Sequence, residues 1–148
     1  MEKIRTATLA DLPQLSHLFN LYRVFYRKKP DIEGAFSFLK ERIQFRESVV
    51  FVAAEGDLLL GFAQCYPLFS SIRMKRILLL NDLFVLEAYR GRGISKALIK
   101  ASQDLTKSTG ASALLLETEK TNRIGNQLYP AMGFVLQGGS NHYLWENE

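Results

Sequence analysis

The chain has 148 residues, a length that suits one compact domain. Hydrophobic residues make up 47% and charged residues 23%, as in a globular protein and unlike a disordered one. The net charge of +4 favours anionic partners, a class that includes phosphorylated cofactors and nucleic acids. No apolar run approaches the roughly 20 residues that span a bilayer, and the N-terminal residues lack the basic-then-apolar order of a signal peptide. We therefore expect a cytoplasmic protein with no membrane partner.

Cysteine and histidine are too scarce for a disulfide framework or a cysteine-rich zinc site. Cys65 is the single cysteine, and the two histidines, His17 and His142, stand far apart in the sequence. We therefore expect no metal. Cys65 lies in an apolar strand without an obvious activating base, so a buried structural thiol is favoured over an acyl-cysteine intermediate.

The N-terminal half alternates helix and strand signals. Thr8 followed by Asp11 resembles a capping box, and apolar residues from Leu12 to Tyr26 recur at helical spacing. A β-branched run and a Glu-Gly-Asp turn then indicate a hairpin. The expected elements are a strand ending at Ala7, helices at 11–27 and 32–45, strands at 49–54 and 58–66, and a loop at 67–73.

The C-terminal half predicts a buried strand followed by an amphipathic helix. The apolar run at 77–86 indicates burial on both faces, and Gly110 ends a helix at 92–109. A strand at 113–117, a helix at 121–132 and strands at 134–136 and 142–145 complete the expected order. The pattern predicts an α/β (α+β) fold, a mixed sheet of about seven strands with about four helices, in a single domain spanning 1–148.

The turn between the strand at 77–86 and the helix at 92–109 suits an anion. Gly91 and Gly93 permit close approach of the backbone, and Arg90 and Arg92 add charge at a helix N-terminus. The loop lacks the pattern of a mononucleotide P-loop and the three spaced glycines of a dinucleotide fold. Taken alone it is also compatible with a tight connection that carries two solvated arginines.

Two segments make the interpretation more specific. Asn81–Val85 followed by Tyr89–Ile94 resembles the signature of the GNAT N-acetyltransferase superfamily, whose acetyl-CoA loop reads Arg/Gln-x-x-Gly-x-Gly/Ala. Ser95 departs from this pattern at the last position, where Gly or Ala is usual, although serine is also a small residue. The segment 122–134 is similar to the family's Asn-x-x-Ala-x-x-Leu-Tyr-x-x-x-Gly-Phe, with Gly125 in place of alanine and Pro130 where a helix former is common.

The resemblance implies acetyl-CoA as the acetyl donor. In the family the strand of the first motif splays from its neighbour, and its free backbone groups pair with the pantetheine arm. Asn122 would contact the cofactor, although it also suits a helix entry. The cofactor-binding residues implied are Leu83, Phe84, Val85, Arg90, Gly91, Arg92, Gly93, Ile94, Ser95, Lys96, Asn122 and Tyr129.

Catalytic roles follow from the chemistry of amine acetylation. Tyr129 is expected to protonate or stabilise the departing thiolate, and the alternative is a tyrosine that packs its helix. Pro130 biases Tyr129 away from helical angles. Asn81 cannot act as a base, so the candidates for deprotonating the amine are Asp82 and then Glu117.

The acceptor is expected to be a primary amine of a small molecule or peptide, as in the histone-acetyltransferase-like and polyamine-acetylating branch that the chain resembles. A homodimer is possible. One other function remains open, an acyl-CoA-binding module without turnover. A nucleic-acid binder is disfavoured because the basic residues lie in ordinary solvated positions, so we expect no nucleic-acid partner. The candidate acceptor-binding residues are Tyr22, Arg23, Tyr26, Tyr66 and Phe69.

Overall fold

A computed structural model describes residues 2–148. These residues form two compact units, one ending at Glu117 and the other spanning Thr118–Glu148. The first unit contains the sheet and three of the helices, and the second contains one helix and the C-terminal segment.

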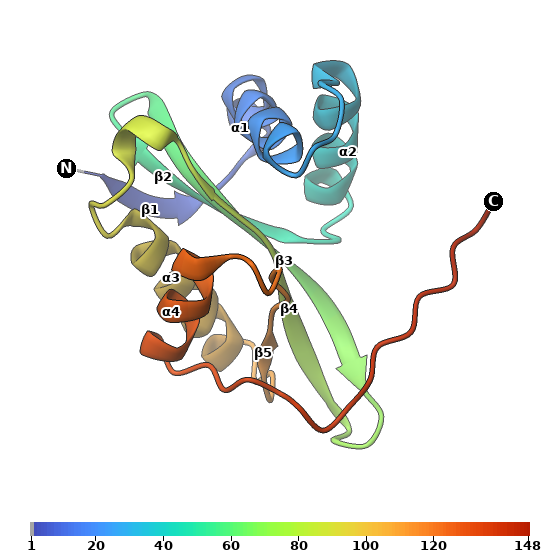
Figure 1. Ribbon diagram of the computed structural model, residues 1–148. Helices are drawn as coiled ribbons and strands as arrows, with labels where there is room; N and C mark the ends of the chain where they lie inside the picture. Colours follow the sequence, from blue (N-terminus) through green and yellow to red (C-terminus); the bar gives the residue numbers. More distant parts are fainter. Residues whose placement is uncertain (1) are drawn as a thin grey trace. The chain divides into compact units, whose positions relative to one another are not determined.

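The first unit is built on a five-stranded sheet in the order β1-β2-β3-β4-β5. Neighbours from β1 to β4 are antiparallel, and β5 runs parallel to β4. Helices α1 and α2 lie on one face of the sheet and α3 on the other (Figure 1). The strands are β1 (Lys3–Thr6), β2 (Val49–Glu55), β3 (Leu58–Ser70), β4 (Lys75–Val85) and β5 (Leu114–Leu115), and the helices are α1 (Leu12–Phe25), α2 (Ile32–Gln44) and α3 (Ile94–Ser108).

The expected helices form because their starts are capped and their apolar residues fall on one side. Asp11 accepts hydrogen bonds from the Thr8 N–H and the Arg5 guanidinium, which confirms the capping box. Leu15 of α1 and Leu39 of α2 are fully buried and pack with Phe62 of β3 in one core. The helical spacing therefore predicted the face that covers the sheet.

Strand β3 extends beyond its expected end at Tyr66 because Pro67 is tolerated there. Pro67 stands opposite Leu78 of β4, while β2 reaches only to the partner of Cys65. Proline lacks a backbone donor, and at this position the donor would face the side that β2 has already left. The loop predicted at 67–73 is therefore wrong in its first part: the strand continues to Ser70 and the turn is shorter.

Strand β4 carries a bulge at Asn81. Leu80 pairs with Cys65 and Asp82 pairs with Gln64, so Asn81 is the additional residue on its strand. A bulge of this kind bends the strand and shifts its alternation by one residue. The sequence-based strand at 77–86 contained no sign of it.

Strand β5 is much shorter than the predicted strand at 113–117. It pairs with β4 only through Leu114 and Leu115, opposite Leu78 and Leu79. Within the described part of the chain, the register shows no partner for the β5 side of β4 from Leu80 to Val85. The pairing of β5 with β4 thus ends at Leu79, two residues before the bulge.

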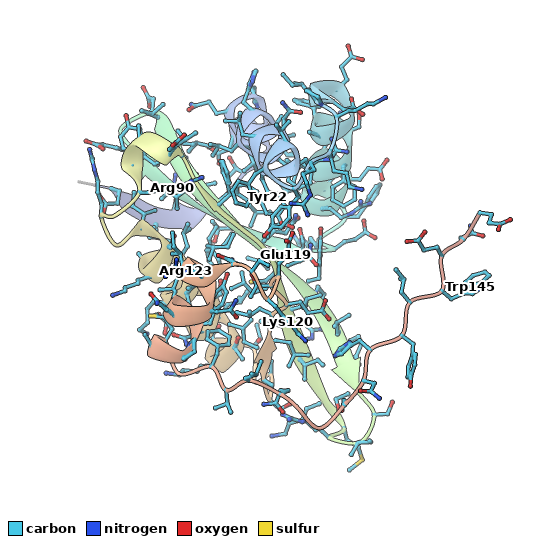
Figure 2. The ribbon with its side chains drawn as sticks, viewed as in Figure 1. Tyr22, Arg90, Glu119, Lys120, Arg123 and Trp145 are labelled. Carbon is cyan, nitrogen blue, oxygen red and sulfur yellow. The ribbon has the colours of Figure 1, made fainter. Side chains whose placement is uncertain are left out.

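The second unit contains α4 (Arg123–Ala131) and a C-terminal segment without strands. The expectation of about seven strands is not confirmed, because residues 2–148 form five. The predicted strands at 134–136 and 142–145 are the two that are missing. β-Branched and aromatic residues favour a strand only where a neighbouring strand pairs with them, and here Leu136 and Trp145 remain 91% and 84% exposed (Figure 2).

Candidate active site

The loop after β4 leads into α3 through two glycines with left-handed backbone. Gly91 has φ +80° and Gly93 has φ +81°, a region that residues with a Cβ rarely adopt. Gly93 is the N-cap of α3 and has no side-chain capping hydrogen bond. A Cβ added at either glycine would meet nothing within 4 Å, so the space beside this backbone is open. The loop thus presents a helix N-terminus, with its partial positive charge, toward open space.

Two arginines flank this turn. The Arg90 Nε donates to the Val85 carbonyl at 2.9 Å, and its guanidinium lies 5.5 Å from the centre of the Phe84 ring. The Arg92 guanidinium stacks 4.9 Å over Tyr89. Arg90, labelled in Figure 2, therefore contacts the end of β4 through both its Nε and its guanidinium plane.

The other loop residues divide into an anchor and exposed positions. Ile94 is 2% exposed and fixes the first turn of α3 in the core. Ser95 is half-buried, and Lys96 is exposed. The side chain of Ile94 is therefore structural, whereas the backbone of this turn and the Lys96 ammonium face outward.

The open edge of β4 follows from its register. The Leu86 N–H donates to the Leu60 carbonyl, and antiparallel partners alternate between bonded and non-bonded pairs. This alternation directs the backbone groups of Phe84 to β3 and those of Leu83 and Val85 to the opposite edge. Before the bulge, the Leu78 N–H faces that edge and donates to the carbonyl of Ala113, the residue just before β5.

A buried polar cluster lies beside the bulge on the α1 side of the sheet. Asp82 is 3% exposed and accepts hydrogen bonds from Gln64 Nε2 at 2.5 Å and Asn81 Nδ2 at 2.8 Å. The Tyr22 hydroxyl of α1 donates to the Asn81 carbonyl at 3.2 Å and also interacts with Asp82. Burial raises the pKa of Asp82, and the hydrogen bonds from its neighbours oppose that rise.

Three of the five predicted acceptor residues gather around this cluster. The Tyr26 ring lies 5.1 Å from that of Tyr22. Burial and the nearby Asp82 carboxylate raise the pKa of Tyr22 and of Tyr66, so both hydroxyls remain protonated near neutral pH. Arg23 instead bonds to the Lys29 carbonyl, and Phe69 is 75% exposed beside Arg76 on the β3–β4 hairpin.

Cys65 lies next to this cluster in sequence but contacts α3. It is 1% exposed and hydrogen-bonds with Ser102. Burial raises the pKa of its thiol to about 11, which disfavours the thiolate that a nucleophile requires. The structure therefore supports the interpretation of a buried structural thiol.

In the second unit, α4 explains why glycine replaces alanine in the second motif. The Asn122 side chain caps α4 by accepting from the Gly125 N–H at 3.0 Å, and it donates to Thr118 at 2.8 Å. A Cβ at Gly125 would lie 2.4 Å from the Asn122 side chain and 3.1 Å from the Tyr129 ring. Gly125 thus makes room for both residues.

Tyr129 stays helical despite Pro130. The proline lies in the last turn of α4, where the Met132 N–H still donates to the Leu128 carbonyl. The half-buried Tyr129 ring packs 5.9 Å from Phe134. The other candidate base, Glu117, is an exposed residue at the end of the first unit.

Two buried residues of the cluster were missed from sequence. Gln64 is fully buried, and its Oε1 accepts from the Ser48 hydroxyl at 2.8 Å. The available signal was a glutamine inside an otherwise apolar run at 58–66, because a buried amide requires partners.

Comparison with known sequences decides the family. Residues 15–134 match the sequence profile of the acetyltransferase (GNAT) family. The chain belongs to the GNAT acetyltransferase family. It is 44% identical over 140 residues to uncharacterized N-acetyltransferase YhfO of Bacillus subtilis (strain 168), covering 95% of this chain and 94% of the relative. It is 33% identical to a probable acetyltransferase of Haemophilus influenzae, covering 78% and 80%. This protein is therefore an N-acetyltransferase, which confirms the predicted enzyme class.

Solved structures agree with this assignment. The crystal structure of a probable acetyltransferase superposes with a TM-score of 0.93 at 32% identity, covering 99% of this chain and 98% of the other. Aminoglycoside N-acetyltransferase AAC(6')-Iy, solved in complex with CoA, shares the fold with a TM-score of 0.83 at 21% identity, covering 99% and 96%. Among residues 2–148, no group of three or more His, Cys, Asp or Glu is placed to hold a metal ion. None of the helices described is both long and apolar enough to cross a membrane.

Proposed function

We propose that this acetyltransferase moves the acetyl group of acetyl-CoA to a primary amine of a small molecule or peptide by direct attack. The observation that carries the proposal is the open edge of β4, which leads into the glycine turn and the uncapped start of α3. An extended chain with a pyrophosphate at one end needs these two features in this order. The family membership supplies the reaction class.

The first unit fits the acetyl donor at its backbone. We assign the pantetheine arm to the outward backbone groups of Leu83 and Val85, and the pyrophosphate to the turn from Gly91 to Lys96. Acetyl-CoA supplies an activated thioester and a thiol leaving group. Because Arg90 Nε already bonds to Val85, the other N–H groups of Arg90 would meet the phosphates. The geometry thus favours Leu83 and Val85 over Phe84 as the residues that bind through their main chain.

Asp82 is the base that the cluster supports best. An ammonium has no lone pair, so the acceptor must lose a proton before it attacks. Burial raises the pKa of Asp82 and makes its carboxylate a better proton acceptor than an exposed one. The Tyr22 hydroxyl, which interacts with Asp82, provides a path for the proton from a less buried position. Glu117 is the second candidate.

We assign Tyr129 the second proton transfer, in which the departing sulfur receives a proton. The deprotonated amine forms a bond to the acetyl carbon while the carbon–sulfur bond breaks, and the sulfur keeps the electron pair. The Tyr129 hydroxyl gives that sulfur a proton. The position of Tyr129 within the second family motif supports this role, and Asn122 holds the start of its helix.

The acceptor class is supported by the range of structural neighbours. They include an aminoglycoside acetyltransferase in complex with sisomicin and a ribosomal-protein-alanine N-acetyltransferase from Brucella melitensis. In both names the acetyl acceptor is an amine, one on a small molecule and one on a protein. At 22% identity these neighbours share the fold alone. The amine class rests on the relative at 44% identity, which is named an N-acetyltransferase, and no individual acceptor is carried over.

The test is a thiol-release assay with acetyl-CoA and a panel of polyamines, amino acids, peptide N-termini and aminoglycosides. We expect release with at least one amine, intersecting lines in two-substrate kinetics, and a drop of roughly tenfold or more in kcat for Tyr129→Phe. Parallel lines with a trapped acetyl-enzyme would contradict direct attack. Tight acetyl-CoA binding without release for any amine would indicate a binding module.

A further inference from the structure

A chain of buried hydrogen bonds connects the start of β2 to Asp82. The Ser48 hydroxyl donates to Gln64 Oε1 at 2.8 Å, and Gln64 Nε2 donates to Asp82 Oδ2 at 2.5 Å. Gln64 is 0% exposed, and Ser48 is 9% exposed. Neither residue lies in the two sequence segments that resemble the family's motifs. A fully buried amide in the middle of a sheet therefore has a partner on each side.

The Ser48 hydrogen bond determines which end of the amide faces Asp82. With Oε1 held by the serine hydroxyl, the NH₂ group points at the carboxylate. A flipped amide would set Oε1 against Asp82 Oδ2, two acceptors in contact in a dry environment. The serine therefore keeps the glutamine in the orientation that donates.

Strand register gives this contact its geometry. Gln64 is paired directly with Asp82 at the position where the β4 bulge begins. Asn81, the bulged residue, donates to the other carboxylate oxygen at 2.8 Å. Side-chain amides from two strands thus donate to one carboxylate oxygen each, and together they fix the plane of the carboxylate.

We propose that Gln64, anchored by Ser48, is the positioning residue that holds the Asp82 carboxylate in its proton-accepting orientation during acetyl transfer. This inference rests on the proposed function, in which Asp82 takes the proton of the amine. Gln64 does not touch substrate and acts through Asp82. Ser48 acts through Gln64.

Several titratable and charged groups surround this carboxylate. Tyr22 comes from α1 and its neighbour Tyr26 is the C-cap of that helix. Cys65 and Tyr66 come from β3, and Arg42 of α2 acts on Tyr66. Tyr22, Tyr66 and Cys65 are neutral near pH 7, because burial raises the pKa of each. Asp82 is the carboxyl of this cluster, and the Gln64 hydrogen bond lowers its pKa against the effect of burial.

The experiment compares Gln64→Leu with a matched change elsewhere. Gln14→Leu removes a glutamine whose amide bonds to the Asp57 carbonyl and the Leu59 N–H, at the β2–β3 turn. In Gln64→Leu, the acid limb of kcat/KM should move up by about one to two pH units, since a hydrogen bond to a charged group is lost. KM for acetyl-CoA should change by less than about twofold. Gln14→Leu should leave the acid limb in place.

Ser48 provides a milder pair of variants if Gln64→Leu fails to fold. Ser48→Ala should shift the acid limb in the same direction by less than about one unit, and Ser48→Thr, which keeps the hydroxyl, should restore it. A uniform loss of activity at every pH, with the acid limb unmoved in Gln64→Leu or Ser48→Ala, would overturn the proposal.

An NMR titration of the Asp82 carboxyl carbon in the free protein separates this inference from the proposed function. The signal is assigned by its loss in Asp82→Asn. A higher pKa in Gln64→Leu than in the parent supports the inference even if no amine on the panel is acetylated. An unchanged carboxyl pKa overturns it. If the carboxyl pKa moves and the acid limb of an active enzyme does not, Asp82 is not the base and the positioning role falls with it.

Discussion

Two neighbouring regions, the bulge in β4 and the glycine turn that follows the strand, are built in opposite ways. Beyond Val85, β4 runs into an exposed turn in which Gly91 and Gly93 leave open space beside the backbone. Four residues earlier, at the bulge, the same strand buries a carboxylate under two amide donors and a tyrosine hydroxyl. The first region suits a charged ligand that arrives from solvent, and the second suits a proton acceptor shielded from it. On the proposed function, substitutions in these two regions should therefore alter donor binding and proton transfer separately.

The largest effect is expected at the bulge of β4, from Asp82→Asn. Asp82→Asn removes the proton acceptor while keeping a side chain of similar size. We expect kcat/KM near neutral pH to fall by roughly 100-fold or more, with KM for acetyl-CoA little changed. Two-substrate kinetics on the parent and the variant measure both values. A comparable loss in Glu117→Gln, with Asp82→Asn active, would transfer the role to Glu117.

Asp82 also links stability to pH, with a sign that follows from its burial. Its folded-state pKa is raised, so the folded protein holds this proton more tightly than the unfolded chain. The stability it contributes is present below the ordinary value of 3.8 and is lost as pH rises through the folded pKa. The Tm of the parent minus that of Asp82→Asn should therefore fall as pH rises over this range. A difference that rises with pH would contradict the burial argument.

The next largest effect is expected at the glycine turn after β4, from Gly93→Ala. Alanine at φ +81° costs about 1–2 kcal/mol, and relief of that strain would move the turn. We expect KM for acetyl-CoA to rise roughly tenfold, with the acid limb of the pH profile unmoved. Gly110→Ala is the matched control, because Gly110 has φ +70° beyond the other end of α3. It should lower Tm similarly and leave that KM unchanged; an equal change in KM would reduce the Gly93 effect to general destabilisation.

A smaller effect is expected for Tyr22→Phe. The ring packs 5.8 Å from Phe62, and phenylalanine keeps that contact while removing the hydroxyl that meets the bulge. We expect kcat/KM to fall by about fivefold, equivalent to about 1 kcal/mol for one hydrogen bond. The check is kcat/KM of the parent and the variant, each measured at the same interval below its own Tm. No change in rate would remove Tyr22 from the proton path.

The smallest effect is expected for Cys65→Ala. The thiol contacts Ser102 on the α3 side, and its pKa of about 11 keeps it protonated. Activity should stay within about twofold of the parent, with a loss of about 1 kcal/mol in unfolding free energy from the lost packing. An abolished rate, or an acetyl group trapped on the parent but not on this variant, would point to a covalent route.

The glycine turn after β4 was predictable from sequence, and the polar cluster at the bulge was predictable only in part. Gly91 and Gly93 are visible because positive φ demands a residue type. The bulge at Asn81 depends on the register of two strands, which no local pattern encodes. Asp82 was proposed from its place in the motif, but Gln64 and Ser48 were not, since their role comes from pairing across strands. The strands at 134–136 and 142–145 were wrong because the prediction had residue preference without a partner.

The proposed separation of donor binding at the glycine turn from proton transfer at the bulge has one most direct test. It is the double variant Gly93→Ala with Asp82→Asn, assayed with the best amine of the panel. The account predicts that the first change alters KM for acetyl-CoA, the second alters kcat, and the losses in kcat/KM multiply in the double variant. A double variant no worse than Asp82→Asn alone, or an Asp82→Asn variant whose defect lies in KM for acetyl-CoA, would contradict it.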